Sequence, residues 1–250
     1  MRAIFMYHSI DPSGSPVSMD REDFRRQVRW MVESEVSVVD FEELLDMPDD
    51  ADAITLTFDD GFANYATEAW PVLAEHGLPA TVFVVSDQVG RTNAWGGVSS
   101  PVIPDIPLMS WDQLAEVAET GARIGGHSRT HAHMIDMSAD ELRDQLETSK
   151  ERLAEETGQA VSVFAYPYGD YDAKTLQATR GVYDLATTTQ HRLLHRDEDR
   201  HLLPRVDAGY FCDAERLASF GSPACSRYVR YLDLRVKARQ ALQFVRGIRP

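Results

Sequence analysis

Two adjacent carboxylates, Asp59 and Asp60, directly follow the apolar segment 54–58 of this 250-residue chain and precede Gly61. Neighbouring ionised carboxylates repel each other and are costly to desolvate, and a bound cation would remove that cost. Because adjacent side chains on an extended segment point apart, one aspartate could bind a metal ion while the other faces a substrate. An acidic turn is the alternative interpretation, since Asp-Asp-Gly is common in loops.

Two histidines, His127 and His131, lie four residues apart after the apolar segment 121–126. Imidazoles at i and i+4 within one turn can converge on a single ion. Two histidines and one carboxylate leave coordination positions open, which is typical of a catalytic metal site rather than a structural one. A polar loop that happens to contain histidine is the alternative, since His133 lies close by. The Asp59–Asp60 pair strengthens the metal interpretation.

A third group, Tyr166-Pro167-Tyr168-Gly169, reads as a rigid turn with aromatic flanks after an apolar run. Sugars pack on aromatic faces, and such a turn can aim a backbone N–H at a developing oxyanion. A turn that packs its aromatic rings on the core is an equally good interpretation of these residues alone.

Apolar segments rich in β-branched residues alternate with helical patterns and would position these groups. We expect strands at 3–7, 36–39, 53–58, 80–85, 121–126, 161–166 and 183–188, and helices after Asp20, at 67–76, at 110–120 and from Ser138 to Gly158. Such alternation predicts an α/β protein with a parallel sheet covered on both faces, either a barrel or a doubly wound sheet. The chemistry then belongs at the carboxyl ends of the strands, and the aperiodic segment 90–109 is expected to be a long loop that borders the site.

The composition excludes several classes of protein. Lys and Arg number 25 and Asp and Glu number 40, so the net charge of −15 disfavours binding to nucleic acid. No apolar run reaches the ~18 residues of a membrane span, and the stretch before His8 is too short for a signal-peptide core. We therefore expect a cytoplasmic location. Cys212 and Cys225 are too few for a disulfide framework and are expected to be packed thiols.

The motifs TFDDG, HSRTH and FAYPYG occur in the order found in NodB-type polysaccharide deacetylases, carbohydrate esterase family four, and the chain resembles that family from residue 6 to residue 206. The resemblance implies a distorted (β/α) barrel of about seven parallel strands. It also implies metal-assisted hydrolysis of an N-acetyl group, or another acyl group, on an amino sugar of a polysaccharide or glycolipid.

The resemblance also assigns roles to residues. Asp60, His127 and His131 resemble the ligands of a divalent metal ion, usually zinc, and Asp59 resembles the general base. The backbone N–H of Tyr168 is expected to stabilise the oxyanion. We expect contacts with the substrate from the following residues: His8, Tyr166, Pro167 and Tyr168.

This chain departs from the family pattern at two places. Many relatives have an arginine, paired with the catalytic base, where this chain has Ala165, and we hypothesise that Arg205, near a late strand end, supplies the missing charge. Relatives also use a late histidine as the general acid. No motif selects among the candidates here, which are His191, His195, His201 and His8, and a solvated loop is the alternative interpretation for the first three.

The C-terminal segment differs in charge from the rest of the chain. We divide the chain into a catalytic domain, 1–225, and a basic amphipathic helix, 226–250, which contains seven Lys or Arg against one acidic residue. Such a helix could lie on an anionic membrane surface, which would suit a lipid-linked sugar substrate at the inner membrane face. The alternative is a closing helix that packs on the barrel or pairs with the acidic body.

Three functions compete on this sequence. Deacetylation of an N-acetylated glycan is favoured by the tyrosines of FAYPYG and by the Tyr7-His8 pair, which resemble exopolysaccharide-modifying members. Hydrolysis of a non-sugar amide is the second. A catalytically silent glycan-binding domain is the third, and it is disfavoured because both aspartates and both histidines of the motifs are intact.

Overall fold

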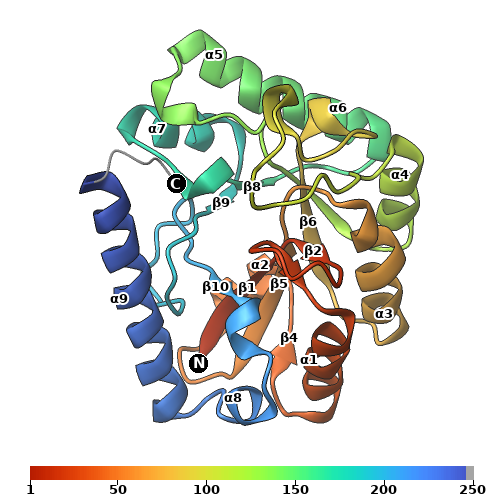
Figure 1. Cartoon of the computed structure of the whole chain (residues 1–250). Coiled ribbons are helices and arrows are strands. Elements are labelled where there is room, and N and C mark those ends of the chain that lie inside the picture. The colour runs from red at the N-terminus through yellow and green to blue at the C-terminus, as the bar shows by residue number, and fades with distance from the viewer. Residues whose placement is uncertain (246–250) are drawn as a thin grey trace.

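The computed structural model describes the backbone of residues 1–245 and the side chains up to residue 238. Within this part of the chain, seven parallel strands follow one another in the order β10-β1-β5-β6-β7-β8-β9 (Figure 1). Their bounds are Arg2–Tyr7 (β1), Ala53–Phe58 (β5), Ala80–Val84 (β6), Arg123–Gly126 (β7), Val163–Ala165 (β8), Leu185–Thr187 (β9) and Val206–Asp207 (β10). The α/β fold with about seven parallel strands is therefore confirmed.

The sheet curls into a distorted barrel. Its two edge strands approach each other where Leu203, just before β10, forms a parallel bridge with Thr187 of β9. A short strand β4 (Ser37–Val38) pairs with the beginning of β5, and β2 (Ser9–Ile10) pairs with β3 (Ser18–Met19) in a separate ribbon above β1.

Helices cover the outside of the barrel (Figure 1). They are α1 (Arg21–Glu33), α2 (Phe41–Asp46), α3 (Trp70–Glu75), α4 (Trp111–Glu119), α5 (Ala139–Arg143), α6 (Ser149–Thr157), α7 (Ala173–Val182), α8 (Ala214–Ala218) and α9 (Pro223–Val245). Side-chain caps fix several of their starts: Asp20 accepts from the N–H of Glu22, and Ser138 forms a capping box with Glu141.

Two expected helices are interrupted by π-helical turns. The helix between Ser138 and Gly158 contains such a turn at Asp144–Thr148, although Gly158 ends it with a φ of 69° as expected. The helix expected at 67–76 begins in a second π-helical turn, Tyr65–Ala69, which places Pro71 in the first turn of α3. Pro71 has no N–H to donate, and it is tolerated there because the adjoining π-helical turn interrupts the regular i→i−4 pattern of the helix.

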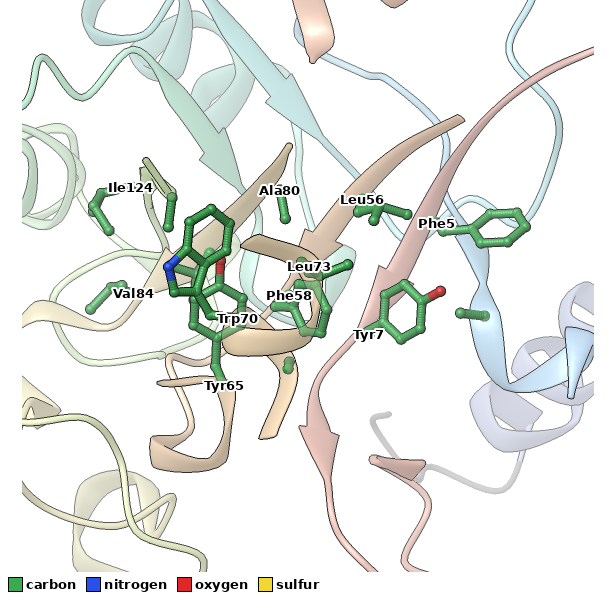
Figure 2. Packing of buried hydrophobic residues seen from close by; sticks show 14 of the residues in the cluster. Phe5, Tyr7, Leu56, Phe58, Tyr65, Trp70, Leu73, Ala80, Val84 and Ile124 are labelled. Carbon is green, nitrogen blue, oxygen red and sulfur yellow. The ribbon is translucent and has the colours of Figure 1, made fainter. Parts of the chain in front are cut away.

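The core forms around β5 and β6, whose residues are all buried. Burial on both faces is characteristic of a parallel sheet covered by helices and explains the near-continuous apolar runs in the sequence. Figure 2 shows Phe58 of β5 between Tyr7 and Tyr65, with ring centroids 4.8 and 4.9 Å away. This packing gives the residues at the ends of the strands a rigid support.

The helix α9 packs on the barrel at its start. Cys225, Val229 and Leu232 are buried, whereas Leu234 is exposed. The helix begins three residues before the expected boundary at 225/226, and residues 246–250 of that segment lie outside the described residues. The closing-helix interpretation is observed for the first turns, and the division into domains stays a prediction. Both cysteines are free thiols, as expected. Among the described residues, no helix combines the length and the hydropathy needed to cross a bilayer.

Candidate active site

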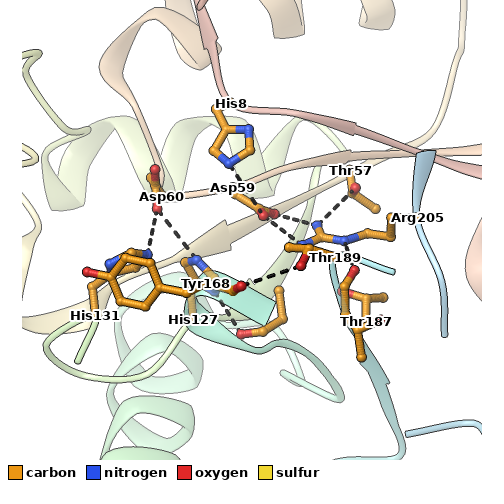
Figure 3. A network of polar contacts seen from close by, with 12 residues as sticks. His8, Thr57, Asp59, Asp60, His127, His131, Tyr168, Thr187, Thr189 and Arg205 are labelled. Carbon is orange, nitrogen blue, oxygen red and sulfur yellow. Dashed lines mark hydrogen bonds and ion pairs between the residues drawn. The ribbon is translucent and has the colours of Figure 1, made fainter. Parts of the chain in front are cut away.

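The ends of two strands that flank β6 in the sheet bring the predicted metal ligands together. Asp60 follows β5, and His127 and His131 follow β7. One ligand atom from each of the three residues lies within 4.8 Å of the other two (Figure 3). The carboxyl edge of the sheet therefore carries a compact site with one oxygen and two nitrogen ligands.

Asp60 presents an unpaired oxygen to both imidazoles. Its Oδ1 lies 3.5 Å from Nε2 of His127 and 3.3 Å from Nε2 of His131, and all three side chains are buried. Within the described part of the chain, this Oδ1 has no hydrogen-bond partner of good geometry. A buried acceptor without a donor is costly, and a cation held by the three side chains would satisfy it. The residues present therefore fit a divalent metal ion.

A hydrogen bond fixes the orientation of His127. Its Nδ1 lies 2.7 Å from the carbonyl oxygen of Ala165. Because a carbonyl only accepts, Nδ1 carries a proton, and Nε2 is the ring atom that faces Asp60. Ala165 therefore contributes to the site through its backbone carbonyl group. Many relatives are expected to have arginine at this position.

The pKa shifts of two ligands, Asp60 and His131, favour the forms that bind a metal ion, whereas the pKa of His127 is raised because the neighbouring carboxylates more than offset the effect of burial. Burial raises the pKa of Asp60, but the imidazoles of His131 and His127 more than offset this effect, and the resulting pKa lies well below the ordinary value. Burial lowers the pKa of His131, which favours its neutral form. An ionised carboxylate and a neutral imidazole are the forms that coordinate a cation.

The backbone that holds the ligands is left-handed rather than regular. Asp60 has a φ of 73° and His131 a φ of 59°. His127 and His131 converge as expected, but the turn that brings them together is not helical, because Ser128 between them also has a positive φ, of 61°. Likewise, the side chains of Asp59 and Asp60 are kept apart by the left-handed turn at Asp60. They are not kept apart by the alternation of side chains along an extended strand. Non-glycine residues in this region cost about 1–3 kcal/mol each and concentrate at functional sites.

Asp59 forms a buried ion pair with Arg205. The guanidinium donates two hydrogen bonds to the two carboxylate oxygens, at 2.6 and 2.7 Å (Figure 3). Arg205 is itself held by Thr188, whose carbonyl oxygen accepts from Nε at 3.0 Å, and by the hydroxyl of Thr57 at 3.3 Å. The hypothesis that Arg205 supplies a charge to Asp59 matches this geometry, although Arg205 comes directly before β10 and not at its carboxyl end.

His8 is the predicted acid candidate that the structure brings to Asp59. Burial raises the pKa of Asp59, but Arg205 and then His8 lower it, so the net pKa is below the ordinary value. Nε2 of His8 lies 3.8 Å from Oδ2 of Asp59, and the side chain is one-quarter exposed. This arrangement leaves His8 within reach of solvent and substrate.

The other three candidate acids have different surroundings. His191 is buried and accepts a hydrogen bond at Nδ1 from the N–H of Asp207, at 3.3 Å. His195 is exposed, and Nε2 of His201 lies 2.8 Å from the carbonyl oxygen of Tyr183. None of these three arrangements directs the ring at Asp59.

The turn after β8 places only Tyr168 at the site. Its ring centroid lies 4.5 Å from that of His131. Tyr166 and Pro167 are buried, and Tyr166 packs on Phe164, so the expected substrate contact through these two side chains is wrong. The apolar interior behind the turn accounts for this burial.

Gly169 is required beside Tyr168 for two reasons. Its φ is 74°, and a Cβ at this position would lie 2.0 Å from the hydroxyl oxygen of Thr189. The sequence pattern therefore reflects a close approach of the Thr189 side chain to the backbone of Gly169.

Trp95 is a member of the site that the sequence did not single out. Its ring stacks on His131 with a centroid separation of 4.3 Å and an angle of 26°. The only sequence signal was its position in the expected loop 90–109, because a loop tryptophan carries no spacing that links it to a histidine 36 residues later.

Known proteins resemble this chain along most of its length. Residues 46–182, more than half of the chain, match the family model described as polysaccharide deacetylase. A poly-β-1,6-N-acetyl-D-glucosamine N-deacetylase of Staphylococcus epidermidis is 23% identical over 205 residues, which are 76% of this chain and 67% of that protein.

Solved structures share the fold. A deacetylase from Streptococcus pyogenes in complex with acetate superposes with a TM-score of 0.73 at 23% identity, over 88% of this chain and 98% of that one. A polysaccharide deacetylase from Bacillus cereus gives a TM-score of 0.74 at 25% identity, over 88% of this chain and 69% of that one.

Proposed function

Because this chain belongs to the polysaccharide deacetylase family, we propose that it removes acetyl groups from the N-acetylated amino sugars of a glycan by metal-dependent hydrolysis. The observation that carries the proposal is the adjacency of two units, the Asp60–His127–His131 site and the Asp59–Arg205 ion pair. The first can hold a cation and the second holds an ionised carboxylate next to it.

Asp60, His127 and His131 would hold the metal ion. A divalent cation bound there supplies a Lewis acid for the amide carbonyl and lowers the pKa of water. We propose zinc as this ion, because two imidazole nitrogens and one carboxylate oxygen with open positions are its usual catalytic ligand set.

Asp59 acts as the general base that takes the proton from the attacking water. Its lowered pKa keeps it ionised, and Arg205 fixes the plane of the carboxylate. Each carboxylate oxygen can accept more than one hydrogen bond, so the two bonds from Arg205 leave acceptor capacity toward the site. Positioned proton transfer of this kind contributes roughly 10²–10⁴-fold to rate.

His8 acts as the general acid that protonates the leaving amine. Its Nε2 lies 3.8 Å from Oδ2 of Asp59, so the base and the acid face the same space. The backbone N–H of Tyr168 stabilises the developing oxyanion beside the metal ligands. The partly exposed ring of Tyr168 and the imidazole of His8 contact the sugar.

Release of acetate from N-acetylglucosamine oligomers, with and without a chelator, tests this function. We expect turnover by the zinc-loaded protein, loss of turnover after chelation and recovery with added zinc, whereas Asp60→Asn stays inactive throughout. Turnover that persists after metal removal would contradict the mechanism. Hydrolysis of small cyclic amides but not of the oligomers would favour an amidase, and glycan binding without turnover would favour a silent binding domain.

We also propose a cytoplasmic location at the inner membrane face and a lipid-linked glycan as substrate. The support is the positive charge of the segment 226–250, which contains seven Lys or Arg residues and one acidic residue. Sedimentation with anionic vesicles tests the membrane contact, using the charge reversals Arg230→Glu and Arg235→Glu at exposed positions of α9. We expect the double variant to bind less, and neutral vesicles to bind neither protein. Equal binding of both proteins to anionic vesicles would contradict this contact.

A further inference from the structure

The two metal-ligating histidines differ in how they are oriented. Nδ1 of His127 donates to the carbonyl oxygen of Ala165, whereas the buried Nδ1 of His131 finds no hydrogen-bond partner among the described residues. A metal-bound histidine ordinarily donates its second ring N–H to a carboxylate, a carbonyl or water, and that bond fixes the plane of the ring. No such bond from a described residue fixes the plane of the His131 ring.

Aromatic rings contact this imidazole instead. The indole of Trp95 stacks on the imidazole of His131, at 4.3 Å and 26°, and the ring of Tyr168 meets the same imidazole at 4.5 Å and 64°. Tyr168 in turn stacks on His133, at 4.0 Å and 15°, and Nδ1 of His133 lies 2.8 Å from Oδ2 of Asp170. His131 is thus one member of a continuous column of rings that begins at Trp95 and ends on a carboxylate.

The backbone of His131 makes this support necessary. Its φ of 59° is unfavourable for a residue with a side chain, and such a conformation persists only where the surroundings determine it. The backbone N–H of His131 donates to the hydroxyl of Ser128 at 3.0 Å, which fixes the main chain but leaves the ring free to turn. The stacked indole restricts that remaining rotation.

Trp95 belongs to a loop that is anchored next to Asp60. The N–H of Ala63 donates to the carbonyl oxygen of Pro107 at 2.9 Å, and the side chain of Asn93 accepts from the N–H of Ile106 at 2.7 Å. Beyond Trp95 the loop turns at two glycines and exposes Val98 to 73%. Trp95 therefore lies at the junction between the anchored part of the loop and its exposed tip.

We propose that Trp95 is a positioning residue that sets the plane of His131 in place of a hydrogen bond to Nδ1, and thereby tunes the affinity of the site for its metal ion. This inference rests on the proposed metal site. The proposal also couples the loop 90–109 to the metal site. A ligand that moves Trp95 changes the affinity of the site for its metal ion. By reciprocity, the bound metal ion changes the affinity of the protein for that ligand.

Metal affinity measured without substrate tests the proposal. Zinc dissociation constants come from competition with a chromophoric chelator, and the visible absorption of bound Co²⁺ reports the ligand geometry. We expect Trp95→Leu and Trp95→Ala to weaken zinc binding about 10–100-fold, the range for outer partners of metal ligands, and to alter the Co²⁺ spectrum. Trp95→Phe keeps a ring and should stay within a few-fold of the unchanged protein.

Val98→Ala is the matched control, because it lies on the same loop, is exposed and should leave zinc affinity unchanged. Circular dichroism melting of the metal-free variants separates a loss of fold from a loss of affinity. Trp95→Leu protein that is folded and binds zinc with unchanged affinity and an unchanged Co²⁺ spectrum would overturn the proposal. Tight zinc binding without acetate release would instead overturn the proposed activity and leave the role of Trp95 intact.

Discussion

Arg205 and Asp59 are 146 residues apart in the sequence, yet the guanidinium of one binds both oxygens of the other, at 2.6 and 2.7 Å. Both side chains are almost fully buried. The pair brings a charge from the residue directly before β10 to a carboxylate at the end of β5. Loss of this pair would therefore change both the free energy of unfolding of the barrel and the pKa of Asp59, the proposed base.

We expect Arg205→Ala to shift the acidic limb of the kcat/KM pH profile to higher pH. Arg205 holds the pKa of Asp59 below its ordinary value, so its removal raises that pKa, and the ionised base is then lost at a higher pH as the solution is acidified. Arg205→Lys keeps one charge and should shift the limb less. An acidic limb that does not move in Arg205→Ala would contradict the pairing as the cause.

The same variant should be less stable. Removal of one partner from a buried ion pair typically costs about 3–5 kcal/mol in the free energy of unfolding, because the remaining charge is left unpaired. Urea unfolding at neutral pH measures this loss. A change of a few tenths of a kcal/mol would show that Asp59 finds another partner.

Asp59→Asn and Asp60→Asn should separate catalysis from metal binding. Asp59→Asn removes the proposed base and should lower kcat by roughly 10²–10⁴-fold with zinc affinity retained. Asp60→Asn removes the charged ligand and should lose both zinc binding and turnover. Acetate release and chelator competition measured on both proteins give the comparison. Loss of zinc binding in Asp59→Asn together with its retention in Asp60→Asn would exchange the two assignments, and equal zinc affinities would contradict them.

His8→Ala should reduce kcat by about 10²-fold with little change in zinc affinity, because His8 faces Asp59 but is not a ligand in the Asp60 site. His195→Ala, at an exposed position, is the control and should be indistinguishable from the unchanged protein. A larger loss in His195→Ala than in His8→Ala would move the acid to the late segment.

Acid should destabilise the metal-free protein through Asp59. Its folded-state pKa lies below the unfolded value of about 3.9, so its ionised form contributes stability that is fully present above that pH and lost as the pH falls toward the folded value. We expect the free energy of unfolding to decline below pH ~4 and to decline less steeply in Asp59→Asn. An equally steep fall of the free energy of unfolding with pH in both proteins would exclude a contribution from Asp59.

Gly126→Ala should destabilise the barrel and disturb the following ligand, His127. A Cβ at Gly126 would lie 2.3 Å from the hydroxyl oxygen of the buried Tyr183, and overpacking of this kind costs about 1–3 kcal/mol. Gly181→Ala in α7 is the matched control, because its Cβ would meet nothing within 4 Å and helix propensity favours alanine. Thermal unfolding of both variants and the zinc affinity of Gly126→Ala check the expectation.

The sequence by itself predicted most strands of the sheet and the residues at their ends, but not the short strand β10 (Val206–Asp207). Apolar runs such as 53–58 mark the strands, caps such as Asp20 mark the helix starts, and each predicted metal ligand lies within a few residues of a strand end. These signals are local, because periodicity and turn chemistry act over a few residues along the chain.

Only the tertiary structure decided which distant residues meet. It placed His8 rather than three other histidines beside Asp59, buried Tyr166 in the core and stacked Trp95 on His131. It also showed that the turn at the histidines is built from left-handed residues, Ser128 and His131. The physical reason is that such contacts depend on strand order, register and the packing of the whole barrel, which leave no fixed spacing in the sequence.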